Sequence, residues 1–141
     1  MERHSGQKCC NLLCGFRSFT IIVPIQTVKG EKAMVTERIE NMCGGEGHVI
    51  IKRILGEKEL NGKCGLYAQV TIEPGCSLGY HEHHSESETY YILAGKGEYD
   101  DNGTKRPVKA GDVTYTPDNC GHALKNTGEE DLVFMALIIF D

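Results

Sequence analysis

The sequence from Gly75 to Gly95 is GCSLGYHEHHSESETYYILAG, and it contains a closely spaced group of metal-binding residue types. Side chains on a β-strand alternate between its two faces, so His81 and His83 are expected to point the same way. Two imidazoles placed like this can reach one ion, each at about 2.0–2.1 Å. A polar turn and a returning strand rich in β-forming residues follow, with Glu88 at the start of that strand. This stretch predicts that His81, His83 and Glu88 share one metal ion.

A second stretch, GDVTYTPDNCGHALKN from Gly111 to Asn126, supplies a further histidine, His122. It lies far along the chain, so a closed β-structure is needed to bring it to the same ion. Three neutral imidazoles and one carboxylate suit a divalent transition metal such as Mn, Fe, Co, Ni, Cu or Zn. In a six-coordinate ion these ligands leave two positions open, as catalytic rather than structural sites do. An exposed polar loop is the alternative for the group, and we expect His84 to face solvent.

The two stretches resemble the two motifs of the cupin superfamily, G-x5-H-x-H-x4-E-x6-G and G-x5-P-x-G-x2-H-x3-N. The first motif matches without a gap, and the second departs from the family pattern only at Asn119, where glycine is usual. Asparagine tolerates a left-handed backbone better than other residues with a side chain, so the departure weakens the resemblance little. The resemblance, which is to small single-domain bacterial cupins, implies an all-β fold: a double-stranded β-helix, or jelly-roll barrel, with the ion inside its mouth.

The rest of the chain shows short strand patterns separated by turn signals, which is typical of sandwiches and barrels. We expect strands over residues 48–55, 65–73, 97–100, 104–108, 112–116, 123–126 and 132–140. Asp101-Asn102-Gly103 indicates a type I′ hairpin. The last strand is almost entirely apolar, which is typical of a strand covered on both faces. Only residues 31–42 show a helical pattern.

Length and composition agree with one small domain. The chain has 141 residues, of which 40% are hydrophobic, so it can bury a core. The net charge is −5 and there is no basic run. These features disfavour nucleic-acid binding through a phosphate-neutralising patch. No apolar run approaches the length of a membrane span, so no membrane partner is expected.

The start of the chain does not follow the strand pattern, so we divide the protein into an N-terminal extension, residues 1–43, and a cupin barrel, residues 44–141. The early apolar run is interrupted and no cleavage site follows it, which argues against a secretory signal. Our preferred hypothesis places the natural start at Met34, because the codons just before it can form a purine run that resembles a bacterial ribosome-binding site. The alternative is an arm in which residues 20–23 add a strand to a partner subunit.

Seven cysteines allow a disulfide or metal hypothesis. Cys9, Cys10 and Cys14 lack the paired spacing of a zinc site. An odd count and no secretory signal favour reduced thiols in the cytoplasm. Cys76 and Cys120 lie in the two motifs, so they can end near one another or near the site; ordinary buried or surface thiols are the simpler interpretation.

Tyr90 is the candidate catalytic residue, because it follows Glu88 by two positions and should point inward beside the ion. A phenol beside a divalent cation can have its pKa lowered and act as a general base or acid. Some metal-dependent cupin lyases are similar, with a tyrosine at this offset. The alternative is that Tyr90 only lines the barrel, while Tyr91 faces outward. We also expect the polar face of strand 65–73, with Gln69 and Thr71, to look into the pocket.

Two classes of function remain open. The resemblance implies a metalloenzyme that acts on a small oxygen-rich molecule, a carboxylic acid or a sugar, by Lewis-acid and proton-transfer chemistry. The family includes isomerases, lyases, decarboxylases and dioxygenases, so the reaction does not follow from the fold. The alternative is a non-catalytic barrel that holds a small molecule with the ion as an anchor. By analogy with small cupins we expect a homodimer, with the C-terminal strand and the strand from His48 at the contact.

Overall fold

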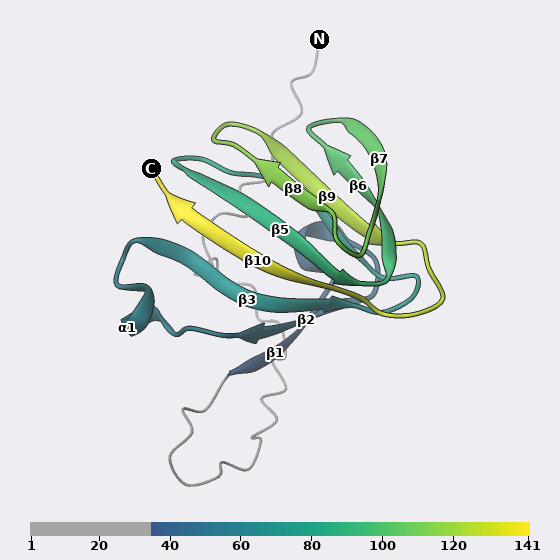
Figure 1. The fold of residues 1–141 in the computed structure, drawn as a ribbon, viewed down its shortest axis with the longest axis horizontal. Helices are drawn as coiled ribbons and strands as arrows, with labels where there is room; N and C mark the ends of the chain where they lie inside the picture. The colour runs from purple at the N-terminus through teal and green to yellow at the C-terminus, as the bar shows by residue number, and fades with distance from the viewer. Residues whose placement is uncertain (1–34) are drawn as a thin grey trace, which may run out of the picture.

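The computed structural model describes residues 35–141 and arranges them in two antiparallel sheets (Figure 1). The larger sheet has six strands in the order β1-β2-β3-β10-β5-β8, and the smaller has four in the order β4-β9-β6-β7. In chain order the elements are β1 (Thr36–Glu40), the 3₁₀ turn η1 (Met42–Gly44), β2 (His48–Arg53), α1 (Glu57–Leu60), β3 (Cys64–Ile72), β4 (Ser77–Glu82), β5 (Glu86–Ala94), β6 (Lys96–Asp101), β7 (Thr104–Lys109), β8 (Val113–Thr116), β9 (Gly121–Asn126) and β10 (Leu132–Phe140). The expected all-β jelly-roll fold is confirmed.

The core lies between the two sheets and follows from the alternation of side chains along each strand. On β3 the residues Leu66, Ala68, Val70 and Ile72 are buried, while the residues between them are half-exposed. Fully burying a side chain such as Ile72 contributes about 1.5–3 kcal/mol. The buried face of β3 is therefore its apolar face. The expectation that Gln69 and Thr71 face the pocket is wrong. Burying the apolar side chains on the other face of β3 stabilises the fold more, so Gln69 and Thr71 lie on the outer face of the sheet.

Strand β10 lies in the middle of the larger sheet, where Figure 1 shows it in yellow between β3 and β5. Phe134 stands opposite Val70 on one side and Ile92 on the other. Leu132, Phe134 and Ala136 on the inward face of β10 are buried, but Met135 and its outward neighbours keep part of their surface exposed. Within residues 35–141, β10 is therefore covered on its inner face and only partly covered on its outer face. The expectation that both faces are covered, which rests on its apolar composition, is wrong for these residues.

Two tight turns have the backbone that the sequence indicates. Asn102 and Gly103, between β6 and β7, both have positive φ, at 51° and 93°. Positive φ at both central residues defines the type I′ hairpin. Asn119 has φ 60°, the left-handed conformation that its motif position needs. Both expectations are confirmed.

The helical pattern over residues 31–42 is wrong for the part that the structure describes. Thr36–Glu40 forms strand β1, which pairs antiparallel with β2 and places Arg38 opposite Ile50. Hydrogen bonding to β2 overrides a weak local preference here, and the β-structure begins before residue 44. Cys9, Cys10, Cys14, Met34 and the possible arm at residues 20–23 lie outside the described residues.

The strands expected to form a dimer contact have no free edge. β2 pairs with β1 and β3, and β10 pairs with β3 and β5. Within the described chain the sheet edges are β1, β8, β4 and β7. In this fold β2 and β10 therefore have no free edge for pairing with a second chain, and only their outer faces are available for a contact. Among the described residues no helix is long and apolar enough to cross a membrane.

Candidate metal centre

The four predicted ligands come from both sheets and meet between them. His81 lies on β4 directly opposite His122 on β9, so the register of the smaller sheet places these two side by side. His83 follows β4, and its backbone N–H donates to the carbonyl of Cys120 at 2.9 Å. The two sequence stretches are thus joined at this turn. Glu88 reaches the same place from β5 of the larger sheet.

All four side chains are buried and one donor atom of each converges on a common point. Relative exposures are 7% for His81 and 1% for His83, 4% for Glu88 and 1% for His122. The Nε2 atom of His122 lies 3.0 Å from Nε2 of His81 and 3.1 Å from Nε2 of His83. Oε2 of Glu88 lies 2.9 Å, 3.1 Å and 3.7 Å from Nε2 of His122, His83 and His81. One ligand atom from each residue lies within 4.8 Å of the others.

The outer nitrogen of each histidine has a hydrogen-bond partner. His81 Nδ1 donates to the carbonyl of Gly79 at 3.0 Å. His83 Nδ1 donates to a carboxylate oxygen of Glu86 at 2.8 Å. Because these oxygens accept, the proton sits on Nδ1 in the neutral ring and Nε2 presents a bare lone pair to the centre. This is the tautomer in which Nε2 binds a metal.

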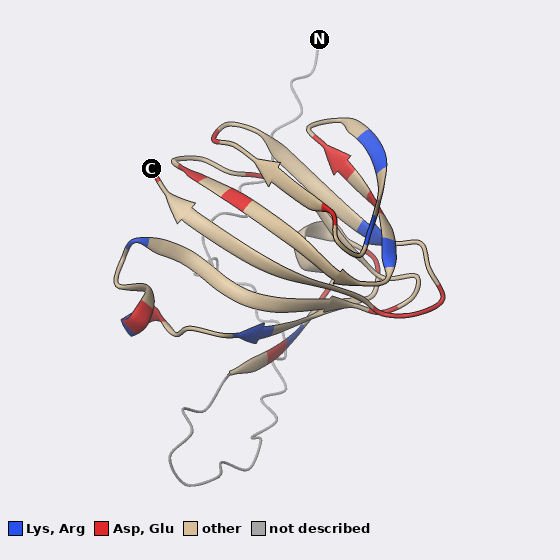
Figure 2. Cartoon of the chain, in the orientation of Figure 1, with Lys and Arg blue, Asp and Glu red and all other residues tan. Residues whose placement is uncertain are grey.

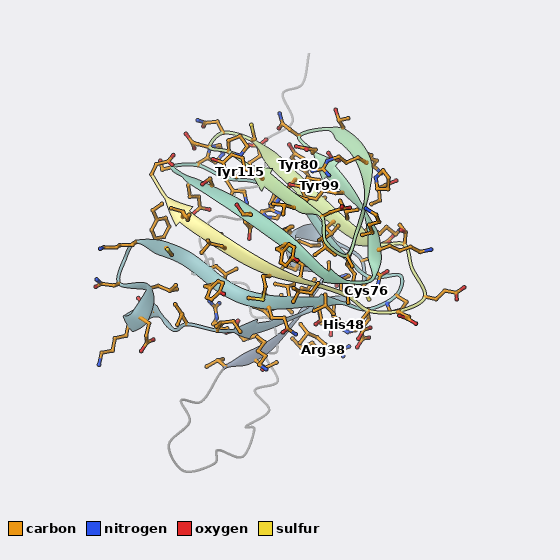
Figure 3. All side chains as sticks on the ribbon, in the orientation of Figure 1. Arg38, His48, Cys76, Tyr80, Tyr99 and Tyr115 are labelled. Carbon is orange, nitrogen blue, oxygen red and sulfur yellow. The ribbon has the colours of Figure 1, made fainter. Side chains whose placement is uncertain are left out.

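His122 is held by two hydroxyl groups. Its Nδ1 lies 2.9 Å from the hydroxyl of Tyr99 and 2.8 Å from that of Thr116, and these two hydroxyls are 2.6 Å apart. Tyr99, labelled in Figure 3, comes from β6 and is fully buried. These contacts with the hydroxyls of Tyr99 and Thr116 fix the orientation of the His122 ring.

The electrostatics favour the protonation states that a metal needs. Burial by itself would raise the pKa of the Glu88 carboxyl, but the surrounding imidazoles of His122, His81 and His83 hold that pKa well below its ordinary value. Burial lowers the pKa of the His122 imidazole, against the attraction of Glu88. An ionised Glu88 and a neutral His122 are the forms that coordinate cations.

The donor set fits a divalent transition metal. Two donors that each lie about 2.1 Å from one ion, at right angles to each other, are about 3.0 Å apart. The separations of 3.0 Å and 3.1 Å between the imidazole nitrogens match that value. Bare nitrogen lone pairs at such distances repel unless positive charge lies between them. The cluster of His81, His83, Glu88 and His122 can therefore hold a metal ion.

A cavity of about 200 Å³ adjoins this cluster. Tyr90 lines it and is 1% exposed, and its hydroxyl donates to Oε2 of Glu88 at 3.1 Å and lies 3.3 Å from Nε2 of His122. Burial first, and then the charge of Glu88, raise the pKa of the Tyr90 phenol well above its ordinary value. Tyr90 thus points inward beside the cluster, while Tyr91 is 48% exposed.

Sequence reasoning missed the residues that support the ligands. Glu86 and Tyr99 contact His83 and His122 through the hydrogen bonds given above. The signal for Glu86 was present, because it precedes Glu88 by two positions and therefore shares its face. The polar composition of residues 84–87, which is typical of a turn, conceals this signal. Tyr99 had no such signal, since its contact depends on the pairing of β6 with β9.

The remaining expectations concern His84 and the cysteines. His84 is exposed and contacts Asn119 and Glu82 rather than the cluster. No disulfide joins the cysteines within residues 35–141. Cys43, which the sequence did not single out, lines the cavity.

Comparison with known proteins gives a consistent result. A family model described as "Cupin domain" matches residues 68–140. The chain is 46% identical over 103 residues to an oxalate-binding protein of Thermotoga maritima, covering 73% of this chain and 85% of that protein. It is 37% identical over 75 residues to the oxalate decarboxylase OxdC of Bacillus subtilis, and this match spans 50% of the chain but only 20% of the decarboxylase.

Solved structures agree. The crystal structure of a predicted oxalate decarboxylase from Thermotoga maritima has a TM-score of 0.74 and 44% sequence identity, with 77% of this chain and 94% of that chain covered. A cupin domain from Schizosaccharomyces pombe, at 19% identity and a TM-score of 0.60, supports the fold alone.

Proposed function

Because the chain belongs to the cupin family, we propose that His81, His83, Glu88 and His122 hold a divalent transition metal and that the adjoining cavity binds a small carboxylic acid there. The observation that carries this proposal is the convergence of four buried donor atoms. The donor set suits Mn, Fe, Co, Ni, Cu or Zn. The names of two relatives, which refer to oxalate, favour a carboxylic acid over a sugar.

Each residue around the cluster has a role in this proposal. Glu86, Gly79 and Tyr99 hold the imidazole rings so that Nε2 faces inward. A bound divalent ion supplies Lewis-acid polarisation of a ligand oxygen. Tyr90 holds a proton at the cavity wall, where its hydroxyl can donate to the acid bound beside Glu88. Tyr90 is therefore the proposed catalytic residue, acting as a general acid.

The proposed class is a metalloenzyme that acts on a carboxylic acid by proton transfer. A second candidate is binding without turnover. It is supported by the cavity wall, which is apolar away from the cluster, and by the name of the relative at 46% identity. The two candidates share the metal and the ligand class, and differ in whether Tyr90 transfers a proton.

The test begins with metal analysis of the purified full-length protein by mass spectrometry. About one equivalent of a transition metal per chain is expected, and its loss is expected in the double variant His81→Ala, His122→Ala. Isothermal titration of oxalate into the metal-loaded protein should then show binding that is absent after chelation. A folded protein that takes up no transition metal when reconstituted would refute the proposal. Conversion of the bound acid into any product, carbon dioxide included, distinguishes an enzyme from a binding protein.

Assembly and location are part of the same proposal. We propose a homodimer, in line with the sequence-based analogy, and a cytoplasmic location, with which the lack of a disulfide among the cysteines of residues 35–141 agrees. Light scattering coupled to size-exclusion chromatography tests the dimer; a mass of one chain at micromolar concentration would contradict it.

A further inference from the structure

The cavity beside the cluster has two chemically different ends. Its polar end is formed by the inward side chains of β4 and β5 with the turn between them: His81, His83, Glu86, Glu88 and Tyr90. The rest of the wall is apolar and includes Ile51 on β2, Leu66 on β3, and Phe134 and Ile138 on β10. Ile51, Leu66 and Phe134 are at most 6% exposed. A ligand seated at the cluster would therefore extend along a hydrocarbon surface.

The charged side chains that line the cavity are all acidic. Among residues 35–141, those that line this cavity include no lysine and no arginine, and their acidic members are Glu86 and Glu88. Figure 2 shows β3 and β10 in tan over almost their whole length, with red segments on β5. Any charge on the ligand beyond the reach of the cluster would have no cationic partner in this wall.

The charge balance sets a limit on the ligand. A dication held by the single carboxylate of Glu88 leaves one net positive charge, which a monoanion cancels. A second carboxylate on the ligand that lies along the wall, beyond the reach of the cluster, meets no lysine or arginine there, and Glu86 adds negative charge. An uncompensated charge in a low-dielectric site is unfavourable. The wall thus opposes a second carboxylate and offers contact to carbon.

We propose that this cavity prefers a monoanionic 2-oxo or 2-hydroxy acid with a short apolar tail. The carboxylate and the adjacent oxygen face the cluster, and the tail lies against Leu66, Phe134 and Ile138. This inference rests on the proposed function and deepens it by naming the ligand class. The cavity volume of about 200 Å³ leaves room for such a tail, since water occupies about 30 Å³ in the liquid.

The apolar wall predicts a measurable gain with tail length. Each methylene group that leaves water for an apolar site strengthens binding about fourfold. Pyruvate, 2-oxobutanoate, 2-oxopentanoate and 2-oxohexanoate share one chelating head, so differences among them report the tail alone. 2-Oxoglutarate has the carbon count of 2-oxopentanoate but ends in a second carboxylate, and it is the matched control for charge.

The experiment is isothermal titration of these acids, and of oxalate, into the metal-loaded full-length protein. We expect affinity to rise by about fourfold per methylene up to 2-oxopentanoate, and 2-oxoglutarate to bind at least about tenfold more weakly than 2-oxopentanoate. Equal or falling affinity along the series, or equal binding of the two five-carbon acids, would overturn the inference. Oxalate binding without a tail effect overturns the inference and leaves the proposed function intact, whereas no binding of oxalate or any 2-oxo acid removes the proposed function itself.

A pair of neighbouring variants locates the tail. Ile138→Ala removes hydrocarbon from the cavity wall and should flatten the rise in affinity along the series. Leu137→Ala, on the opposite face of β10, makes a similar truncation outside the wall and should leave the rise unchanged. Metal content by mass spectrometry checks that both variants are loaded. Equal slopes for the two variants would place the tail elsewhere and contradict the assigned wall.

Discussion

Replacing Glu86 with glutamine is expected to weaken metal binding while the protein stays folded. The Glu86 carboxylate is 6% exposed and accepts the Nδ1–H of His83 at 2.8 Å. Glutamine keeps the size of the side chain but removes its charge. Its amide can also present an N–H to Nδ1, which would favour the tautomer whose Nε2 carries the proton. The lone pair of His83 would then no longer face the cluster.

The size of the effect follows from comparable metal sites. Loss of a group that orients a metal-bound histidine typically costs 10–100-fold in metal affinity, which is about 1.4–2.7 kcal/mol. Metal binds the folded state, so the same free energy is lost from metal-dependent stabilisation. For a chain of this length that corresponds to a reduction of roughly 5–9 °C in the difference between the metal-loaded and metal-free melting temperatures.

The metal-free protein should respond differently. Glutamine needs no compensation for a buried charge, so the melting temperature of the metal-free variant should equal or exceed that of the wild type. Competition with a chromophoric chelator measures the affinity, and calorimetric melting with and without chelator measures the stabilities. Glu82→Gln makes the same charge change on β4, where the side chain contacts exposed His84, and should leave the metal affinity within about twofold.

Two results would refute this reasoning. One is a Glu86→Gln protein with wild-type metal affinity, which would mean that the hydrogen bond to His83 does not set the tautomer. The other is equal loss of affinity in Glu82→Gln and Glu86→Gln, which would mean that net charge near the site matters rather than contact with the ring.

Three further predictions concern the same region. Tyr90→Phe should keep metal affinity within about tenfold and, if the protein is an enzyme, lower turnover by about 10²–10⁴-fold, the usual contribution of a general acid; unchanged turnover would remove Tyr90 from the chemistry. Gly79→Ala should lose about 1–3 kcal/mol of unfolding free energy, because the added methyl collides with the backbone carbonyl of Cys43; denaturant titration measures this, and wild-type stability would contradict it. Asn126→Ala should lose about 3 kcal/mol, since its buried amide makes hydrogen bonds of 2.8 Å with Ile72, Glu130 and Gly128; a midpoint shift at constant m-value is the expected signature.

The ligands were predictable from the sequence because their geometry is mostly local. Alternation along a strand places His81 and His83 on one face, and Glu88 returns on the next strand after a short turn. Asn102-Gly103 was predictable for the same reason, since turn chemistry is written in adjacent residues. His122 was reached only through its motif, because its position opposite His81 depends on the register between β4 and β9.

The errors came from features that depend on partners far along the chain. The segment Thr36–Glu40 has a single large apolar residue, Ile39, so its two-residue period was weak, and pairing with β2 decided its structure. The prediction that Gln69 and Thr71 face the pocket rests on the expected need for polar groups around a substrate. Leu66 and Val70 on the other face of β3 line the pocket instead, because burying these apolar side chains is more favourable than burying polar ones.

Burying the four polar side chains of the cluster is energetically unfavourable unless they bind a ligand, and this unfavourable burial supports a functional interpretation. Three imidazoles and a carboxylate are removed from water, and their inner atoms, at separations near 3 Å, include bare nitrogen lone pairs. An apolar filling of the same volume would avoid both the desolvation and the repulsion. A cation at the centre offsets both the desolvation and the repulsion, since it neutralises the carboxylate and accepts the lone pairs. Hydrogen bonds with Gly79, Glu86 and Tyr99 hold the rings in that orientation, so the surrounding fold stabilises an arrangement that a bound cation would make favourable.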